Sequence, residues 1–279
     1  MYSDSKTAIP KKGSKIMRIN NNITAINSHR QYGINNGNIG KNVEKLSSGF
    51  RVNRAGDDAA GLAISEKMRT QIRGLNMASK NSQDGISLVQ TAEGAMQTAH
   101  NIMQRMRELA VQSANGTNDD DVDRNALDLE FQALADEIEQ IQDTVKFNGM
   151  EIFGKSFTIQ SGANKDDETD FDIGEISGVT GDIKSQSAAQ EAIDNLTTAI
   201  NDLSTSRAEL GAIQNRLEFK IQNLDNSAEN LAAAESRIRD VDMAKMMTEF
   251  TKNNILFQAS TAMLAQANAI PQSVLQLVG

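Results

Sequence analysis

The chain has 279 residues, a length that fits one or two domains. Its 37 acidic residues outnumber its 28 lysines and arginines, which gives a formal charge of −9. Nucleic acids and anionic membranes would repel such a chain, so we expect neither as a partner. The sequence has no cysteine, which excludes disulfides and thiolate-bound metals. No apolar run approaches the roughly 18 residues of a membrane span.

Proline is the most informative residue type. The only two are Pro10 and Pro271, so residues 11–270 contain none of the residue that breaks helices. Hydrophobic residues make up 39% of the chain and aromatic ones 4%, too few for a large compact core. We therefore expect long helices with narrow apolar seams, buried partly against other chains.

Residues 1–16 differ from the remainder, because they are rich in lysine and contain Pro10 and Gly13. They have no apolar stretch of the kind found in a secretory signal. The amphipathic pattern begins only at Met17. We expect Met17 to be the natural start and residues 1–16 to be an N-terminal extension.

Residues 17–56 carry apolar side chains at helical spacing, and residues 57–146 continue in two further seams. The first of these seams lies within 57–114 and the second runs from Leu127 to Val145, with a polar turn at 115–118 between them. We expect the two to fold back antiparallel. Residues 147–185 break the pattern, and their alternating apolar and polar residues predict a small β-hairpin. We expect this hairpin at the end of the rod far from the termini.

Residues 186–238 give the clearest periodicity. Steps of three and four from Ile193 reach Leu196, Leu203, Leu210 and Leu217 and continue to Ile238. This heptad pattern predicts a coiled-coil helix of more than six heptads. The fold class is therefore mainly α, a long antiparallel coiled-coil rod with a small β-hairpin region at one end.

Residues 239–279 repeat apolar side chains every seven positions, at Met243, Phe250, Phe257 and Leu264. Both ends of the chain are thus amphipathic, whereas chain ends are commonly polar and frayed. They either pair with each other or associate with other chains, and we favour association.

The sequence offers no active site. The two histidines, His29 and His100, stand outside any metal-binding motif, and no phosphate-binding glycine loop or nucleophile elbow is present. The acidic pair Asp57 and Asp58 lacks the spacing of a calcium loop and favours a helix start. We expect no catalytic residue, no cofactor and no metal, and therefore no enzyme.

Several long strings resemble bacterial flagellin. They are LSSGFRVNRAGDDAAGLAIS at 46–65, MQRMRELAVQSANGT at 103–117, FNG at 147–149 and ESRIRDVDMAKMMTEF from Glu235 onward. Only about 40 residues separate Gly149 from the long coiled coil, so the chain resembles a short form without the variable outer domains. Residues 1–16 have no counterpart in the family.

The resemblance implies a structural subunit that polymerises into the extracellular flagellar filament and serves motility. It also implies export in an unfolded state by the flagellar type III apparatus. Implied partners are further copies of the chain, an export chaperone at the C-terminal helix (about 240–277), and the flagellar cap and hook-junction proteins. The apolar residues of the terminal segments suit polymerisation, namely Ile19, Ile23, Ile26, Val43, Leu46, Met243, Met247, Phe250, Phe257 and Leu264.

The segment around Arg105 is similar to the part of flagellin that the vertebrate Toll-like flagellin receptor recognises. The resemblance implies a receptor patch of Gln104, Arg105, Leu109 and Glu130. From spacing alone, Arg105 is an ordinary solvated residue that shares a helix face with Leu109. The alternative within the family is a hook–filament junction protein, and the alternative outside it is a secreted helical-bundle enzyme.

Overall fold

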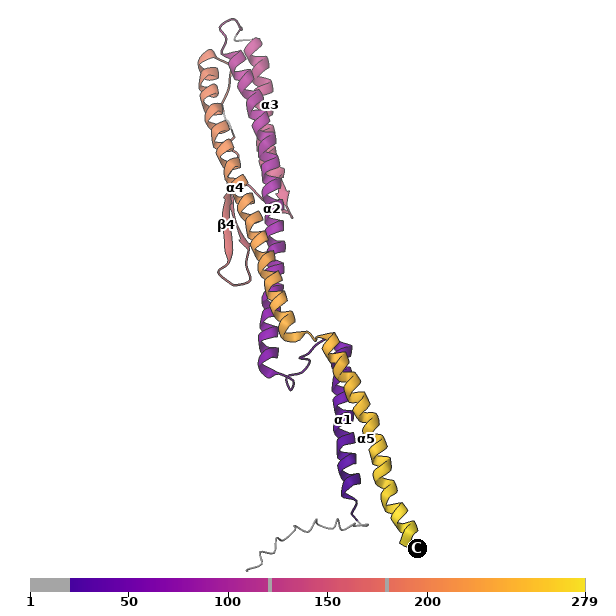
Figure 1. Cartoon of the computed structure of the whole chain (residues 1–279). Helices are drawn as coiled ribbons and strands as arrows, with labels where there is room; N and C mark the ends of the chain where they lie inside the picture. Colours follow the sequence, from indigo (N-terminus) through magenta and orange to yellow (C-terminus); the bar gives the residue numbers. More distant parts are fainter. Residues whose placement is uncertain (1–20, 120–121, 179–180, 279) are drawn as a thin grey trace, which may run out of the picture. The chain divides into compact units, whose positions relative to one another are not determined.

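The computed structural model describes residues 21–119, 122–178 and 181–278 (Figure 1). Residues 1–16, Met17 and Ile19 lie outside the described residues. The chain divides into two compact units. The terminal unit comprises the described residues up to Ser65 together with those from Ser236 onward, and the central unit comprises Glu66–Glu235.

The terminal unit is an antiparallel pair of helices, α1 (Ile23–Ser48) and α5 (Met243–Val278), which lie side by side in Figure 1. The ring of Tyr32 on α1 lies 4.9 Å from that of Phe257 on α5, measured between centroids. Helix α1 ends at Gly49, whose positive φ of 75° lets its amide bond back to the carbonyl of Lys45. Terminal segments that are far apart in sequence therefore form one coiled-coil pair.

The connections that leave this pair also run antiparallel. The amide of Arg51 donates to the carbonyl of Arg239 at 2.7 Å, and the amide of Val241 donates to the carbonyl of Gly49 at 3.0 Å. The guanidinium of Arg239 lies 4.6 Å from the centroid of the Phe50 ring. Backbone hydrogen bonds and a cation–π contact thus hold together the segment that follows α1 and the segment that precedes α5.

The central unit is built on α2 (Ala59–Ser113), α3 (Asp123–Thr144) and α4 (Gln186–Arg239). The first residues of α2 and the last residues of α4 belong to the terminal unit. Leucines of α4 at every seventh position are buried, which confirms the predicted coiled coil. They are Leu196, Leu203, Leu210, Leu217 and Leu224. Buried methionines of α2 and Phe131 and Ile138 of α3 belong to the same core. Helices α2 and α3 run antiparallel, as predicted: Arg124 at the start of α3 donates to the carbonyl of Ser113 at the end of α2, and Arg105 pairs with Glu130 further along both helices.

Four short strands follow α3: β1 (Lys146–Phe147), β2 (Met150–Glu151), β3 (Lys155–Gln160) and β4 (Glu168–Ile173). Strands β1 and β2 pair antiparallel, and so do β3 and β4. In the second pair Phe157 stands opposite Phe171, so the predicted hairpin is confirmed.

The position of the hairpin corrects the expectation that it caps one end of the rod. The amide of Asn81 on α2 donates to the carbonyl of Gln160 at 3.2 Å, and Ala163 lies against Gly74 of the same helix. The hairpin therefore runs along the side of α2. Alternate residues of β4 are buried, and they need a helix face to cover them. A hairpin projecting from the end of the unit would leave those residues in water.

Candidate assembly and recognition surfaces

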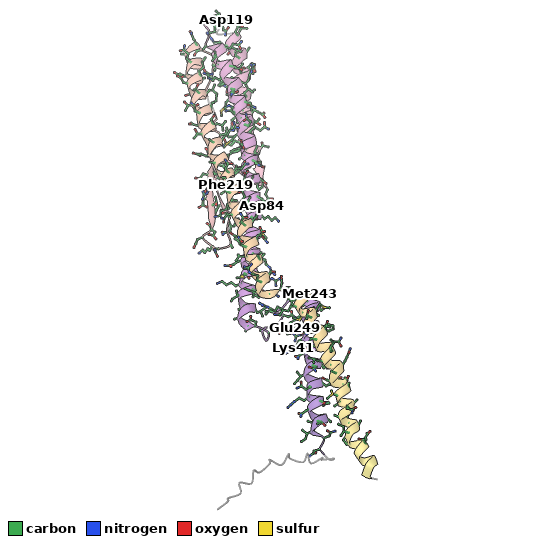
Figure 2. The ribbon with its side chains drawn as sticks, in the orientation of Figure 1. Lys41, Asp84, Asp119, Phe219, Met243 and Glu249 are labelled. Carbon is green, nitrogen blue, oxygen red and sulfur yellow. The ribbon has the colours of Figure 1, made fainter. Side chains whose placement is uncertain are left out.

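Both helices of the terminal unit keep large apolar side chains in contact with solvent. On α1, Ile23 is 60% exposed and Ile26 is 63% exposed, and Val43 is also exposed. On α5, Met243 (labelled in Figure 2) and Met247 are about half exposed. These five residues, which we call the outer face, are among those that the sequence predicts to support polymerisation. Large apolar side chains left in water on both helices are candidates for burial against another chain.

The remaining expected polymerisation residues lie elsewhere. Leu46, Phe250, Phe257 and Leu264 are half-buried, in the seam between α1 and α5. They hold the pair together rather than facing outward. The sequence grouped both sets because each is apolar and recurs at helical spacing, and only the pairing of α1 with α5 separates them.

The α1–α5 seam also buries polar residues that the apolar pattern did not reveal. Asn35 and Asn42 are 9% and 8% exposed. The Asn35 side-chain amide donates to Ser260 Oγ at 2.8 Å and to the Leu256 carbonyl at 3.3 Å. The sequence does carry a signal for these buried polar residues, because Ser28, Asn35 and Asn42 recur at every seventh position.

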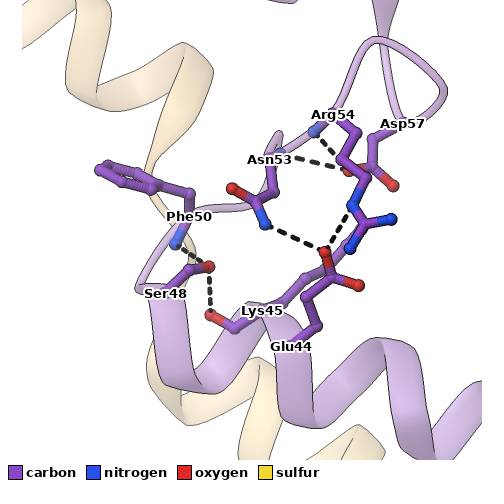
Figure 3. A network of polar contacts seen from close by, with 7 residues as sticks. All are labelled: Glu44, Lys45, Ser48, Phe50, Asn53, Arg54 and Asp57. Carbon is purple, nitrogen blue, oxygen red and sulfur yellow. Dashed lines mark hydrogen bonds and ion pairs between the residues drawn. The ribbon is translucent and has the colours of Figure 1, made fainter.

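The loop after α1 is organised by two carboxylates (Figure 3). Glu44 accepts from the side chains of Asn53 at 3.0 Å and Arg54 at 2.9 Å. Asp57 accepts from the backbone amides of the same two residues, at 3.2 and 3.1 Å. These backbone hydrogen bonds lower the pKa of Asp57, because they favour its charged form. Asp58 accepts from the amide of Gly61 at 2.8 Å and so caps the start of α2, as the helix-start interpretation predicted.

Arg105 in the central unit joins α2 to α3. Its Nε and Nη2 atoms donate to one carboxylate oxygen of Glu130, at 3.0 and 2.8 Å, and its Nη1 donates to Glu108 at 3.1 Å. The hydrogen bonds to Glu130 and Glu108 raise the pKa of Arg105. All three side chains remain about half or more exposed. Sequence reasoning had named Arg105 and Glu130 but had missed Glu108, which lies three residues along the same helix.

The other two expected receptor residues, Leu109 and Gln104, take no part in these ion pairs. Leu109 is 1% exposed and belongs to the core of the central unit, so its side chain offers no surface to a receptor in this conformation. Gln104 is exposed, with its amide nitrogen 2.9 Å from Nε2 of His100. It lines a shallow groove between α2 and α4, together with Val111 and Ile200.

Among the described residues, no group of three histidine or acidic side chains is placed to hold a metal ion. Within the same residues, no helix is both long and apolar enough to cross a membrane.

Family models match both ends of the chain. The bacterial flagellin N-terminal helical region matches residues 19–158, and the bacterial flagellin C-terminal helical region matches residues 193–278. The chain belongs to the bacterial flagellin family. Only residues 159–192, which include β4 and the start of α4, separate the two matches, so this flagellin is a short form.

Named relatives agree over almost the whole length. Flagellin of Halalkalibacterium halodurans is 56% identical over 272 residues, and flagellin of Bacillus subtilis is 50% identical over 303 residues. The flagellar filament 33 kDa core protein of Treponema phagedenis is 47% identical over 286 residues. Each alignment covers 94% of this chain and 100% of the relative. The crystal structure of Bacillus cereus flagellin is 34% identical and covers 56% of this chain and 94% of its own, with a TM-score of 0.49.

Proposed function

We propose that this flagellin polymerises through the outer face of its terminal unit, and that this contact drives filament growth. Membership of the flagellin family makes the chain a structural subunit of the extracellular flagellar filament. The observation that supports the proposed contact is the set of exposed side chains on α1 and α5, Ile23, Ile26, Val43, Met243 and Met247. A filament is an open helical polymer, so each copy must meet its neighbour with two different surfaces.

Burial of the outer face supplies the driving force for assembly. Removing apolar surface from water stabilises the assembled state by about 25 cal/mol per Å². Ordering a helix costs about 1–2 kcal/mol per residue of backbone entropy. The α1–α5 pair of an isolated chain therefore has little stability, and burial against neighbouring copies offsets this cost. We infer that the terminal unit reaches its full stability only within the filament.

Filament seeds give the direct test. Purified chain added to sheared seeds is expected to elongate them, as seen by electron microscopy. A hook–filament junction protein would bind the seed end and stop, so seeds that bind the chain without growing would refute the proposal.

The same helices suit an export chaperone. We infer that the chain leaves the cell unfolded through the flagellar type III apparatus, with a chaperone on the C-terminal helix, about residues 240–277. Ile255 and Met263 are exposed on α5 and give such a chaperone an apolar surface. A chaperone bound there would cover part of the outer face, so its addition should block elongation of seeds. Elongation unaffected by saturating chaperone would contradict this assignment.

We also infer contacts with the flagellar cap and hook-junction proteins at the filament ends, and recognition by the Toll-like flagellin receptor of hosts. For the receptor we propose Gln104, Arg105, Glu108 and Glu130 as the contacting side chains, because all four are exposed on neighbouring surfaces of α2 and α3. Leu109 is assigned a supporting role beneath them, since it is buried. We propose a structural role without catalysis, and a casein-cleavage assay should give no product.

A further inference from the structure

The seam between α1 and α5 is divided into one apolar and one polar column. On α1, the apolar column contains Ala25, Tyr32, Ile39 and Leu46, and the polar column contains Ser28, Asn35 and Asn42, each with a period of seven. On α5, Phe250, Phe257 and Leu264 form the apolar column, and Asn253 and Ser260 belong to the other. The contacts between Tyr32 and Phe257 and between Asn35 and Ser260 place like columns against like.

From this pattern we infer that Asn35 and Asn22 are positioning residues that fix the register of α1 against α5. Asn35 is buried, and in the observed register its amide is satisfied by Ser260 and the carbonyl of Leu256. A buried asparagine in a coiled-coil seam specifies one register at a cost in stability, because other registers strand its polar atoms. A slip of one heptad would set Asn35 opposite Asn253 or Ala267 instead.

Asn22 provides a second lock, which depends on Pro271. Pro271 lies inside α5 and has no N–H, so the carbonyl of Ala267 lacks its usual partner four residues on. The side-chain nitrogen of Asn22 donates to that carbonyl at 2.7 Å. The side-chain oxygen of Asn22 meanwhile accepts from the amide of Ala25 and caps the start of α1. One side chain thus ties the beginning of α1 to a single position on α5.

The polar column also lowers the stability of the pair. Asn42 is buried, and within the described part of the chain its side-chain nitrogen has no hydrogen-bond partner. A seam that is half polar selects one register and holds it weakly. The polar column therefore raises the specificity of the pairing while lowering its stability. A polymer of amphipathic helices needs a specific register, because a pair in the wrong register would present displaced surfaces to neighbouring copies.

The test uses the full chain with spin labels on introduced cysteines. The native sequence contains no cysteine, so His29→Cys on α1 and Thr261→Cys on α5, both at exposed positions, would carry the only labels. Labelled chain is diluted into unlabelled chain and grown onto seeds, and electron–electron double resonance then reports the distance within one copy. The doubly labelled chain without further substitution, which we call the background chain, is compared with the same chain carrying Asn35→Leu. The matched control carries Asn36→Leu, because Asn36 is an exposed neighbour on the same helix.

The background chain and Asn36→Leu are expected to give one narrow distance distribution. Asn35→Leu is expected to give a broadened distribution or a second population displaced by roughly 10 Å along the helix, the length of one heptad. Exclusion of Asn35→Leu from filaments that accept Asn36→Leu, with the central unit still protease-resistant, would also support the inference. An unchanged narrow distribution for Asn35→Leu would overturn it.

Asn22→Asp keeps the test decisive if the leucine variant folds poorly. Aspartate caps a helix as well as asparagine does but cannot donate to Ala267. It is expected to broaden the distance distribution at least twofold, and an unchanged width would remove Asn22 from the register lock. Failure of the unsubstituted chain to grow on seeds at all would instead refute the proposed polymerisation, so the two ideas fail separately.

Discussion

Replacing Ile26 with alanine is expected to weaken polymerisation without unfolding the chain. Ile26 is 63% exposed on α1, so the isolated chain gains little from its side chain. Full burial of an isoleucine stabilises by about 1.5–3 kcal/mol, and burying the exposed two thirds on assembly is therefore worth about 1–2 kcal/mol. Because each 1.4 kcal/mol corresponds to a factor of ten, the critical concentration for elongation should rise by about 5- to 30-fold.

The assay is seeded elongation over a range of subunit concentrations, followed by light scattering and checked by electron microscopy. Asn38→Ala is the matched control, since Asn38 is exposed on the same helix but polar. Its critical concentration should stay near that of the unsubstituted chain, and both variants should keep the same urea midpoint for the central unit. An unchanged critical concentration for Ile26→Ala would show that this side chain stays in water in the filament, and would refute the assembly role of the outer face at this point.

Three further outcomes follow from the geometry. Leu109→Ala should destabilise the central unit by about 2–5 kcal/mol in urea unfolding, because it removes a fully buried side chain; a loss below 0.5 kcal/mol, on the order of a surface substitution, would contradict the core assignment. Arg105→Ala should weaken receptor binding at least about tenfold in surface plasmon resonance while leaving the urea midpoint of the central unit nearly unchanged, because its ion pairs are exposed, and equal binding would remove Arg105 from the proposed receptor surface. For Asp57 the folded-state pKa lies below the unfolded value of about 3.9, so its stabilising contribution is complete above that pH and is lost as the pH falls through the folded pKa. NMR titration should therefore show the amides of Asn53 and Arg54 shifting together only below about pH 4, and a transition near pH 5 would contradict the bonding in Figure 3.

Periodicity predicted most of the fold because a coiled coil leaves a one-dimensional signature. The heptad leucines of α4 are buried as predicted, and the absence of proline between residues 11 and 270 matches the long helices. The stretch of alternating residues around Phe157 and Phe171 became β3 and β4. Each of these signals depends on neighbours along the chain, which the sequence displays directly.

The details that periodicity missed depend on contacts between elements. Arg105 and Leu109 are four residues apart, and helical spacing predicts that they share one helix face. Helix α2 packs against α3 and α4, and in this packing Leu109 is buried in the core whereas Arg105 stays in water. The position of the hairpin depends in the same way on contacts between elements, because it packs on a face of α2 that the sequence alone does not identify.

The polar seam was overlooked for a different reason. A search for apolar residues passes over Asn35 and Asn42, although their spacing of seven is as regular as that of Phe250 and Phe257. Pro271 was noted in the sequence as a residue that breaks helices, yet it lies within α5 because Asn22 satisfies the carbonyl that proline leaves free. Tertiary hydrogen bonds of this kind are invisible to a reading of composition and period.

Hydrogen exchange, compared between dilute chain and seeded filament, tests most directly the claim that the terminal helices are completed by neighbouring copies. The amides of α1 and α5 are expected to exchange rapidly in dilute chain and to become strongly protected in the filament, while α2, α3 and α4 of the central unit stay protected in both. Equal and strong protection of α1 and α5 in the two states would contradict the account, because it would mean that a solitary molecule already holds its terminal pair without help.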